Sequence, residues 1–317
     1  MNIVYLGSGQ FGIDCLNALM GSNHSLDFIV TQPPHQAGRG RKPRPTPVAD
    51  WAKAHSAAFI ETDDVNKPQT IEQIRNYQPD IVVVIAFGQK IGKELINMPA
   101  KDAINVHASL LPKYRGAAPI NWAIINGESE TGISIITLAE KMDAGKILSR
   151  QKTDITANET AGQLHDRLAK MAAPLLLQTI EKIADGSVTY SEQDHAKATR
   201  APKLKKSDGF LDFTEPAETL VRKILGFSQW PGAAALYVSK KSGRCERIII
   251  AMAQIVESSN TLTLQPGVLD DNLNVICGKD ALKIKRIKPA AGSLMDFNDF
   301  VNGRATQPGD LFMKIDS

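Results

Sequence analysis

The sequence has few cysteines and no long apolar segment. Its three cysteines, Cys15, Cys245 and Cys277, lie far apart among 317 residues and form no C-x-x-C pair. This spacing excludes a disulfide framework and a cysteine-cluster zinc site, and it fits a reducing compartment. No apolar run reaches the roughly eighteen residues of a membrane span. Because the first twenty residues also lack a basic n-region, we expect no signal peptide and a cytoplasmic protein.

Neither sign of charge dominates. Lys and Arg number 37 against 34 Asp and Glu, for a net charge of +3. Two acid-free clusters nevertheless stand out: Arg39, Arg41, Lys42 and Arg44 in one, and Lys197, Arg200, Lys203, Lys205 and Lys206 in the other. Charge runs of this kind are usually solvated loops. Cationic loops that contain prolines can also contact nucleic-acid phosphates.

The length and the 43% content of hydrophobic residues indicate a globular protein of about two domains. The N-terminal two thirds alternates strand and helix patterns. The run 80–87 has the unbroken apolar character of a strand buried on both faces. Apolar residues recur at helical spacing over 159–184. We therefore predict an α/β domain with a doubly wound, Rossmann-like, mostly parallel sheet over residues 1–196.

The pattern changes after residue 200. Residues 197–209 are basic and lack periodicity, which predicts a linker. Five short strand-like segments follow within residues 210–317, and this density favours a small OB-like β-barrel. The predicted strands are 234–238, 247–256, 261–264, 273–276 and 281–287.

A glycine-rich segment near the N-terminus matches the dinucleotide-binding pattern. It reads Gly7-Ser-Gly9-Gln-Phe-Gly12 and lies between a strand and a helix. A nicotinamide site of this kind also needs an acidic residue at the end of the second strand, where this chain has Val30-Thr-Gln-Pro-Pro34. We therefore interpret the glycines as a tight turn and expect no nicotinamide cofactor.

Residues 105–145 carry the polar groups with the most chemical promise. Asn105 and His107 are two apart on a predicted strand, so their side chains point to the same face. They also lie where that strand ends, at the edge where open α/β sheets bind ligands. With the distant carboxylate of Asp143 they form a plausible set for acyl transfer. A histidine at a strand end can equally be structural.

Metal chemistry has little support in the sequence. The remaining histidines lack the spacing of metal ligands and are widely scattered, at His24, His35, His55, His165 and His195. We predict no catalytic metal.

The segment SLLPKYRGAAPINWAI, preceded by NVH and followed some thirty residues later by DAG, resembles the formyltransferases that use 10-formyltetrahydrofolate. The resemblance covers nearly the whole chain, with TQPPHQAGRG near the N-terminus and WPGA, QPGVL and KPAAG in the C-terminal region. It is greatest to family members whose acceptor is the methionine of initiator tRNA. The function it implies is formyl transfer to that α-amino group, in support of translation initiation.

The resemblance also implies a set of site residues. Asn105, His107 and Asp143 match the catalytic positions, with His107 either a base or an oxyanion donor. The folate-binding positions are Ser109, Leu110, Leu111 and Pro112, and the pteridine is expected against Phe87, Ile91 and the segment 138–142. Positions for tRNA binding are Arg39, Arg41 and Lys42, to which the basic cluster adds Lys203, Lys205 and Lys206.

Two other functions remain open at this point. One is a folate-dependent formyltransferase for a small molecule, or a formyltetrahydrofolate hydrolase. The other is a non-catalytic RNA-binding protein, for which the polar trio would not converge. In either case we expect no membrane association, and we expect a monomer.

Overall fold

The computed structural model describes residues 1–37, 42–258, 264–290 and 292–316. Its contacts divide the chain into two compact units. The first, here called the sheet unit, comprises Met1–Pro119, Glu130–Asp154 and His165–Pro202. The second, the barrel unit, comprises Ile120–Ser129, Ile155–Leu164 and Lys203–Ser317.

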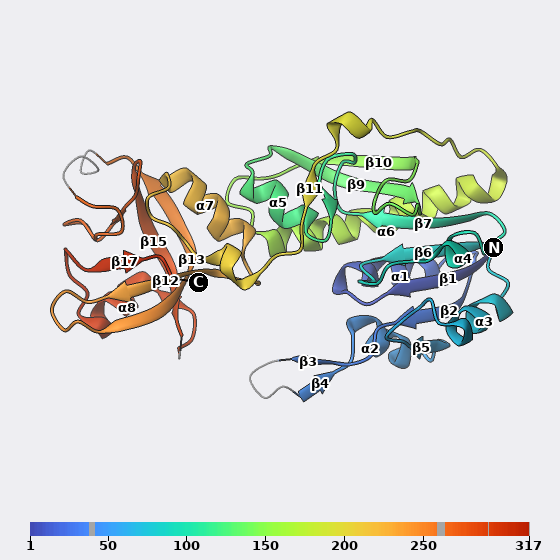
Figure 1. Ribbon diagram of the computed structural model, residues 1–317, viewed down its shortest axis with the longest axis horizontal. Helices are drawn as coiled ribbons and strands as arrows, with labels where there is room; N and C mark the ends of the chain where they lie inside the picture. The colour runs from blue at the N-terminus through green and yellow to red at the C-terminus, as the bar shows by residue number, and fades with distance from the viewer. Residues whose placement is uncertain (38–41, 259–263, 291, 317) are drawn as a thin grey trace. The chain divides into compact units, whose positions relative to one another are not determined.

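The sheet unit is built on seven strands in the order β10-β9-β7-β6-β1-β2-β5, which can be followed in Figure 1. Their bounds are β1 Asn2–Gly7, β2 Ser25–Thr31, β5 Phe59–Glu61, β6 Ile81–Ile85, β7 Asp102–His107, β9 Glu130–Thr137 and β10 Ile147–Asp154. All neighbouring pairs are parallel except those made by β9. The strand order reverses between β1 and β6, as in doubly wound sheets. The predicted α/β class is confirmed.

Helices and short ladders complete this unit. The helices are η1 Gln10–Gly12, α1 Ile13–Met20, α2 Pro47–Ala54, α3 Pro68–Asn76, α4 Lys93–Ile96, α6 Ala161–Asp185 and η2 His195–Lys197. The two-stranded ladders are β3 His35–Ala37 with β4 Lys42–Arg44, and β8 Arg115–Gly116 with β11 Arg200–Ala201. No helix among the described residues has the length and apolar character needed to cross a membrane.

Local sequence explains the central strands. All five residues of β6 are buried, as expected for an apolar strand covered on both faces. Alternate residues of β1, β2 and β6 pack into one core cluster with Phe87, Ile91 and Ala103. Ala103 lies on β7, so this cluster covers the face of β7 on which residues 103, 105 and 107 project.

The glycine-rich turn after β1 is filled by the protein itself. A Cβ atom at Gly12 would overlap the hydroxyl of Tyr5, and one at Gly7 would lie 2.5 Å from the same ring. Burial raises the pKa of the Tyr5 phenol well above its usual value. At Gly9 the added atom would lie 3.1 Å from Ala86. The glycines therefore give space to Tyr5 and to the turn after β6.

The barrel unit carries an antiparallel sheet in the order β14-β15-β13-β12-β17, with β16 paired to β15. Isolated bridges from 268 to 311 and from 269 to 275 nearly close this sheet, so the predicted barrel is confirmed. The elements are α5 Pro119–Ile125, η3 Lys206–Gly209, α7 Ala217–Gly226, β12 Ala233–Val238, β13 Cys245–Val256, β14 Val275–Ile276, β15 Ala281–Pro289, β16 Met295–Asp296, α8 Phe297–Arg304 and β17 Leu311–Met313. Most of the strand predicted over 261–264 lies outside the described residues.

Candidate active site

Asn105 and His107 come from the carboxyl half of β7. In the ladders Asn105 is opposite Val84 of β6 and Ile136 of β9. His107 is the last residue of the strand and is only 6% exposed. Both residues project on the same face as Ala103, so an amide and an imidazole follow one another along one face of the sheet.

The imidazole of His107 is held between a backbone carbonyl and a carboxylate. Its Nε2 lies 2.9 Å from the carbonyl oxygen of Tyr114. Because a carbonyl oxygen can only accept, Nε2 carries a hydrogen. Its Nδ1 lies 3.6 Å from Oδ2 of Asp143, too far for a direct hydrogen bond. The neutral imidazole therefore has its lone pair on Nδ1, facing the carboxylate.

Asp143 lies in the connection between β9 and β10, and its side chain is 11% exposed. Oδ2 accepts a hydrogen bond of 2.8 Å from the backbone N–H of Gly116. The residue has φ +53, in the left-handed region that non-glycine residues seldom occupy. The position of the carboxylate near His107 therefore depends on an unfavourable backbone conformation at Asp143. The structure thus brings the predicted catalytic groups of His107 and Asp143 close together. Asn105, the third, lies two residues before His107 on β7.

The segment from Ser109 to Pro112 connects this strand end to Tyr114. The Ser109 hydroxyl donates to the carbonyl of Lys113, and Ser134 Oγ accepts from the backbone N–H of Leu111. Ser109 and Leu111 are fully buried, whereas Leu110 and Pro112 are half-buried. Within this segment, Ser109 and Leu111 therefore stabilise the loop, and the side chains of Leu110 and Pro112 are partly exposed.

An apolar surface accompanies the polar groups. Phe87 and Ile91 belong to the core cluster that contains Ala103, and Leu138 packs against the same cluster. An ion pair of 2.9 Å from Lys93 of α4 to Glu140 joins the two segments that carry these residues. The predicted pteridine-binding segments 87–91 and 138–142 are thus brought to one cluster, on the face of β7 that carries Asn105.

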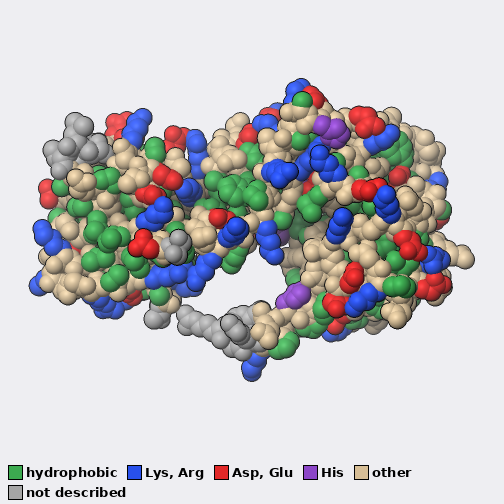
Figure 2. Space-filling view, in the orientation of Figure 1, with side chains coloured by type: hydrophobic (Ala, Val, Ile, Leu, Met, Phe, Trp, Pro, Cys, Tyr) green, Lys and Arg blue, Asp and Glu red, His purple; other side chains and the backbone are tan. Residues whose placement is uncertain are grey.

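The predicted tRNA-binding residues belong to other segments of the chain. Arg39 and Arg41 fall outside the described residues, whereas Lys42 is exposed at the start of β4. Lys203, Lys205 and Lys206 are exposed at the start of the last segment of the barrel unit. In the view of Figure 2, Lys and Arg side chains are interspersed with acidic ones.

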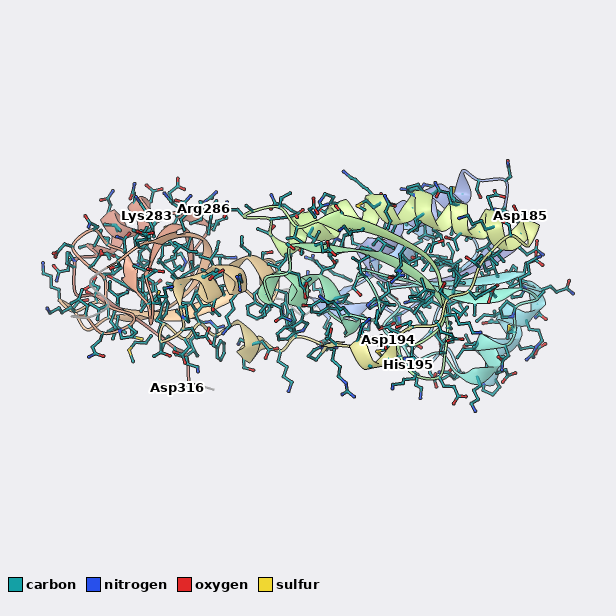
Figure 3. All side chains as sticks on the ribbon, turned by 90° about the horizontal axis from the view of Figure 1, so that it is seen from above. Asp185, Asp194, His195, Lys283, Arg286 and Asp316 are labelled. Carbon is teal, nitrogen blue, oxygen red and sulfur yellow. The ribbon has the colours of Figure 1, made fainter. Side chains whose placement is uncertain are left out.

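Sequence reasoning missed two buried polar residues beside the site. Gln193 is 5% exposed, and its amide donates to the carbonyls of Asp143 (2.9 Å) and Gly145 (2.7 Å). Arg115, 8% exposed, donates to Oε1 of Gln193 and to His195, which is labelled in Figure 3. Arg115 stands within the R-G-A-A-P motif. Gln193, fifty residues from Asp143, had no signal in the sequence.

The sequence matches two known protein families over most of its length. The family described as formyl transferase matches residues 1–180, and the one described as formyl transferase, C-terminal domain, matches residues 203–305. The chain therefore belongs to the formyl transferase family, and the resemblance seen in its motifs is confirmed.

Its curated relatives have a narrower name. The chain is 36% identical to a methionyl-tRNA formyltransferase of Citrifermentans bemidjiense over 100% of its length and 98% of the relative. It is also 36% identical to the methionyl-tRNA formyltransferase of Trichlorobacter lovleyi, over 98% of its own length and 96% of the relative.

A solved structure shares the fold. HypX from Aquifex aeolicus, crystallised in complex with tetrahydrofolic acid, superposes with a TM-score of 0.59 at 15% identity. The match covers 95% of this chain, which spans about half (47%) of the HypX chain. At this identity the likeness concerns the fold alone. Among the described residues no group of three or more His, Cys, Asp and Glu side chains could hold a metal ion.

Proposed function

We propose that this chain transfers the formyl group of 10-formyltetrahydrofolate to the α-amino group of methionine esterified to initiator tRNA, and so supports translation initiation. Full-length relatives at 36% identity support the acceptor. The observation that carries the chemistry is the approach of His107 Nδ1 to Asp143 Oδ2 at 3.6 Å, at the strand end that also carries Asn105.

Proton transfer falls to His107. The Tyr114 carbonyl accepts the hydrogen on Nε2, so the neutral ring has its lone pair at Nδ1. An amine that attacks the formyl carbon becomes positively charged, and Nδ1 is the base that accepts its proton. The Asp143 carboxylate then stabilises the imidazolium, because a negative charge at this distance favours the charged form. Before the attack the α-amine must be neutral, and its ordinary pKa, near 8, makes the loss of that first proton inexpensive near neutral pH.

Asn105 has the complementary role. Negative charge develops on the formyl oxygen as the amine attacks. An amide N–H positioned beforehand at that oxygen stabilises the transition state, and loss of such a donor costs about 10²–10³ in rate. Its position on β7 places the amide next to His107 without any movement of the backbone. When bound, the folate supplies the activated formyl group. As the bond between its N10 and the formyl carbon breaks, the His107 imidazolium would return the proton to N10, and tetrahydrofolate leaves.

The folate is proposed to lie along the apolar cluster beside β7. Phe87, Ile91 and Leu138 would contact the pteridine, since they line the same cluster near Asn105. From the Ser109–Pro112 segment, Leu110 and Pro112 would contact the ligand, while Ser109 and Leu111 hold the loop in place. All of these residues belong to the sheet unit, so the folate site needs no contribution from the barrel unit.

The tRNA is proposed to contact exposed cations. Lys42 lies on the β3–β4 ladder, and the same role is assigned to Arg39 and Arg41, which are outside the described residues. Lys203, Lys205 and Lys206 supply a second contact in the barrel unit. Lysines of this kind bind the phosphate backbone and release counterions, so the affinity should fall as salt rises.

The proposed domain boundaries follow from the assignment of catalysis and tRNA binding to different segments. Residues 1–196 form the catalytic domain, 197–209 a basic connection, and 210–317 a domain that binds tRNA. We further propose that the enzyme is a cytoplasmic monomer, which needs neither a metal nor a nicotinamide for this reaction.

A direct assay tests the proposal. Purified protein is incubated with 10-formyltetrahydrofolate and initiator tRNA charged with methionine, and the product is analysed for formylmethionine. Formylation of the charged tRNA, and none of free methionine, is the expected result. Formylation of a small amine in preference to charged tRNA would point to another formyltransferase, whereas tRNA binding without any formyl product would contradict an enzymatic function.

A further inference from the structure

We infer that Gln193 is a positioning residue for catalysis, whose side-chain amide holds the Asp143 loop at the distance from His107 that the reaction needs. The inference rests on the proposed function, because it concerns the same site. It assigns a role to a residue remote in sequence from the catalytic motifs.

The contacts of Gln193 join two structural elements. Its Nε2 donates to the carbonyl oxygens of Asp143 (2.9 Å) and Gly145 (2.7 Å), which flank the turn. Its Oε1 accepts from Nε (3.1 Å) and Nη2 (2.5 Å) of Arg115. A single buried side chain thus connects the loop of the catalytic carboxylate to β8, on which Gly116 donates its N–H to that carboxylate.

Arg115 fixes the orientation of the amide. A guanidinium can only donate, so the atom of Gln193 that faces it must be the oxygen. The NH₂ group is then directed to the two carbonyls, which can only accept. Arg115 is itself buried, and its Nη2 also lies 2.9 Å from Nδ1 of His195, which must therefore accept. The pairing leaves the amide one orientation.

The loop has a specific need for this support. Asp143 has φ +53, a backbone conformation that is unfavourable for a residue with a side chain. At Gly145 a Cβ atom would overlap the carbonyl of Thr137, so the turn also lies close against β9. Two hydrogen bonds to the carbonyls on either side of Ala144 stabilise this backbone. Without them the carboxylate can move relative to His107.

The segment that carries Gln193 is itself fixed on both sides. Ser191 exchanges two backbone hydrogen bonds with Ile147, the first residue of β10 (2.8 and 2.9 Å). Further along, Thr199 accepts from the backbone N–H of Arg115 through its carbonyl and from that of Tyr114 through its hydroxyl. Residues 191–199 therefore hold both the Asp143 loop and Tyr114, the residue before β8 whose carbonyl contacts His107.

The experiment compares two variants. Gln193→Glu keeps an acceptor for Arg115 but cannot donate to the carbonyls, whereas Gln193→Ala removes both contacts. If Gln193 positions Asp143, both variants lose about 10- to 100-fold in kcat with little change in KM, since a displacement of about 1 Å can cost that much. Retention of kcat by Gln193→Glu would overturn the inference. Gln163→Ala is the matched control, because that amide accepts from Thr160 at the start of α6 (2.9 Å) and should leave kcat unchanged.

A double-mutant cycle separates positioning from general stability. In the Asp143→Asn background the Gln193→Glu change should cost almost nothing further, because the group it positions is already lost. Additive losses would mean that Gln193 acts independently of Asp143, and would overturn the inference.

Hydrogen exchange tests the same idea without activity. In Gln193→Glu the backbone amides of residues 139–146 and of Gly116 should exchange faster than in the wild type, and those of α3 should not. Unchanged exchange would contradict the inference. If the wild-type protein formylates no methionyl-tRNA, the proposed function fails, while the exchange experiment still decides the role of Gln193.

Discussion

Each unit of the molecule buries a carboxylate, and the two are treated differently. In the barrel unit, Asp310 is completely buried and accepts from the Tyr237 hydroxyl (2.5 Å), the Lys240 N–H (2.8 Å) and the Gln307 N–H (3.0 Å). In the sheet unit, the Asp143 carboxylate accepts from the backbone N–H of Gly116 (2.8 Å), and its Oδ2 lies 3.6 Å from Nδ1 of His107.

The difference separates stability from chemistry. At Asp310 both carboxylate oxygens accept from donors of the protein and the group is completely buried, so it is closed to a ligand and connects β12 to the segment before β17. At Asp143 the carboxylate and the facing Nδ1 keep free lone pairs. Buried polar groups are costly unless satisfied. Under the proposed function, the substrate would complete the network at Asp143 and His107.

The largest expected effect is a loss of kcat at the His107–Asp143 pair. His107→Ala should lower kcat for formylation by about 10²–10³, while the Kd for tRNA changes little, because the imidazole acts in the transition state. Steady-state kinetics and a binding titration measure the two quantities. His165→Ala, on α6 of the same unit, is the control. Equal losses in kcat and in tRNA affinity would place His107 in tRNA binding.

At Asp310 a substitution should lower the stability of the fold rather than the activity. Asp310→Asn directs an NH₂ group at an existing donor, and an unsatisfied buried donor costs about 2 kcal/mol of unfolding free energy. Denaturant unfolding measures this loss, with kcat of the folded protein unchanged. Asp271→Asn, an exposed neighbour, should be neutral. A fall in kcat greater than the fall in folded fraction would remove the contrast between the two carboxylates.

Exposed cations should affect affinity alone. Replacement of Lys203, Lys205 and Lys206 by Ala should weaken tRNA binding about 10-fold at moderate salt and reduce the salt dependence, because each lost phosphate contact removes about one unit of slope. The control triple replaces Lys53, Lys67 and Lys152, each of which faces a carboxylate within 4.0 Å. Kd measured across a salt series distinguishes the two triples. If both triples weaken tRNA binding equally, the three barrel-unit lysines act only through the net charge of the protein and make no specific contact.

The smallest effect concerns Asp212 of the barrel unit. Hydrogen bonds from the Thr214 hydroxyl and from Lys314 lower the pKa of this carboxyl to about 2. A lowered pKa stabilises the fold above the ordinary value of 3.8, and the contribution is lost as the pH falls towards about 2. Asp212→Asn should thus lower Tm by about a degree at pH 6 and have no effect near pH 2. A constant difference across that range would contradict this.

Much of the fold could be predicted from local patterns. The apolar run that became β6 and the periodic segment that became α6 carry strong signals of burial and of helical spacing. The two-residue ladder of β8 and β11 had none. Its strands are about 85 residues apart along the chain and are held by backbone hydrogen bonds, which any sequence can form.

The site divides in the same way. Asn105 and His107 were predicted from their spacing on one strand, and Asp143 from the family motif. Gln193 could not be predicted, because it acts on backbone carbonyls and therefore needs no matching residue type at its partners. The half-buried and fully buried members of the Ser109–Pro112 segment were also indistinguishable, since only the folded loop decides which side chains face inward.

The attachment of residues 191–199 has a practical consequence for dissecting the protein. A fragment cut at residue 180, where the match to the N-terminal family ends, would contain every group assigned to the chemistry. It would lack Gln193 and Thr199, and with them the hydrogen bonds that secure the turn at Asp143 and the backbone at Tyr114. A truncated catalytic piece must therefore extend at least through Pro202 to be a fair test of autonomous activity.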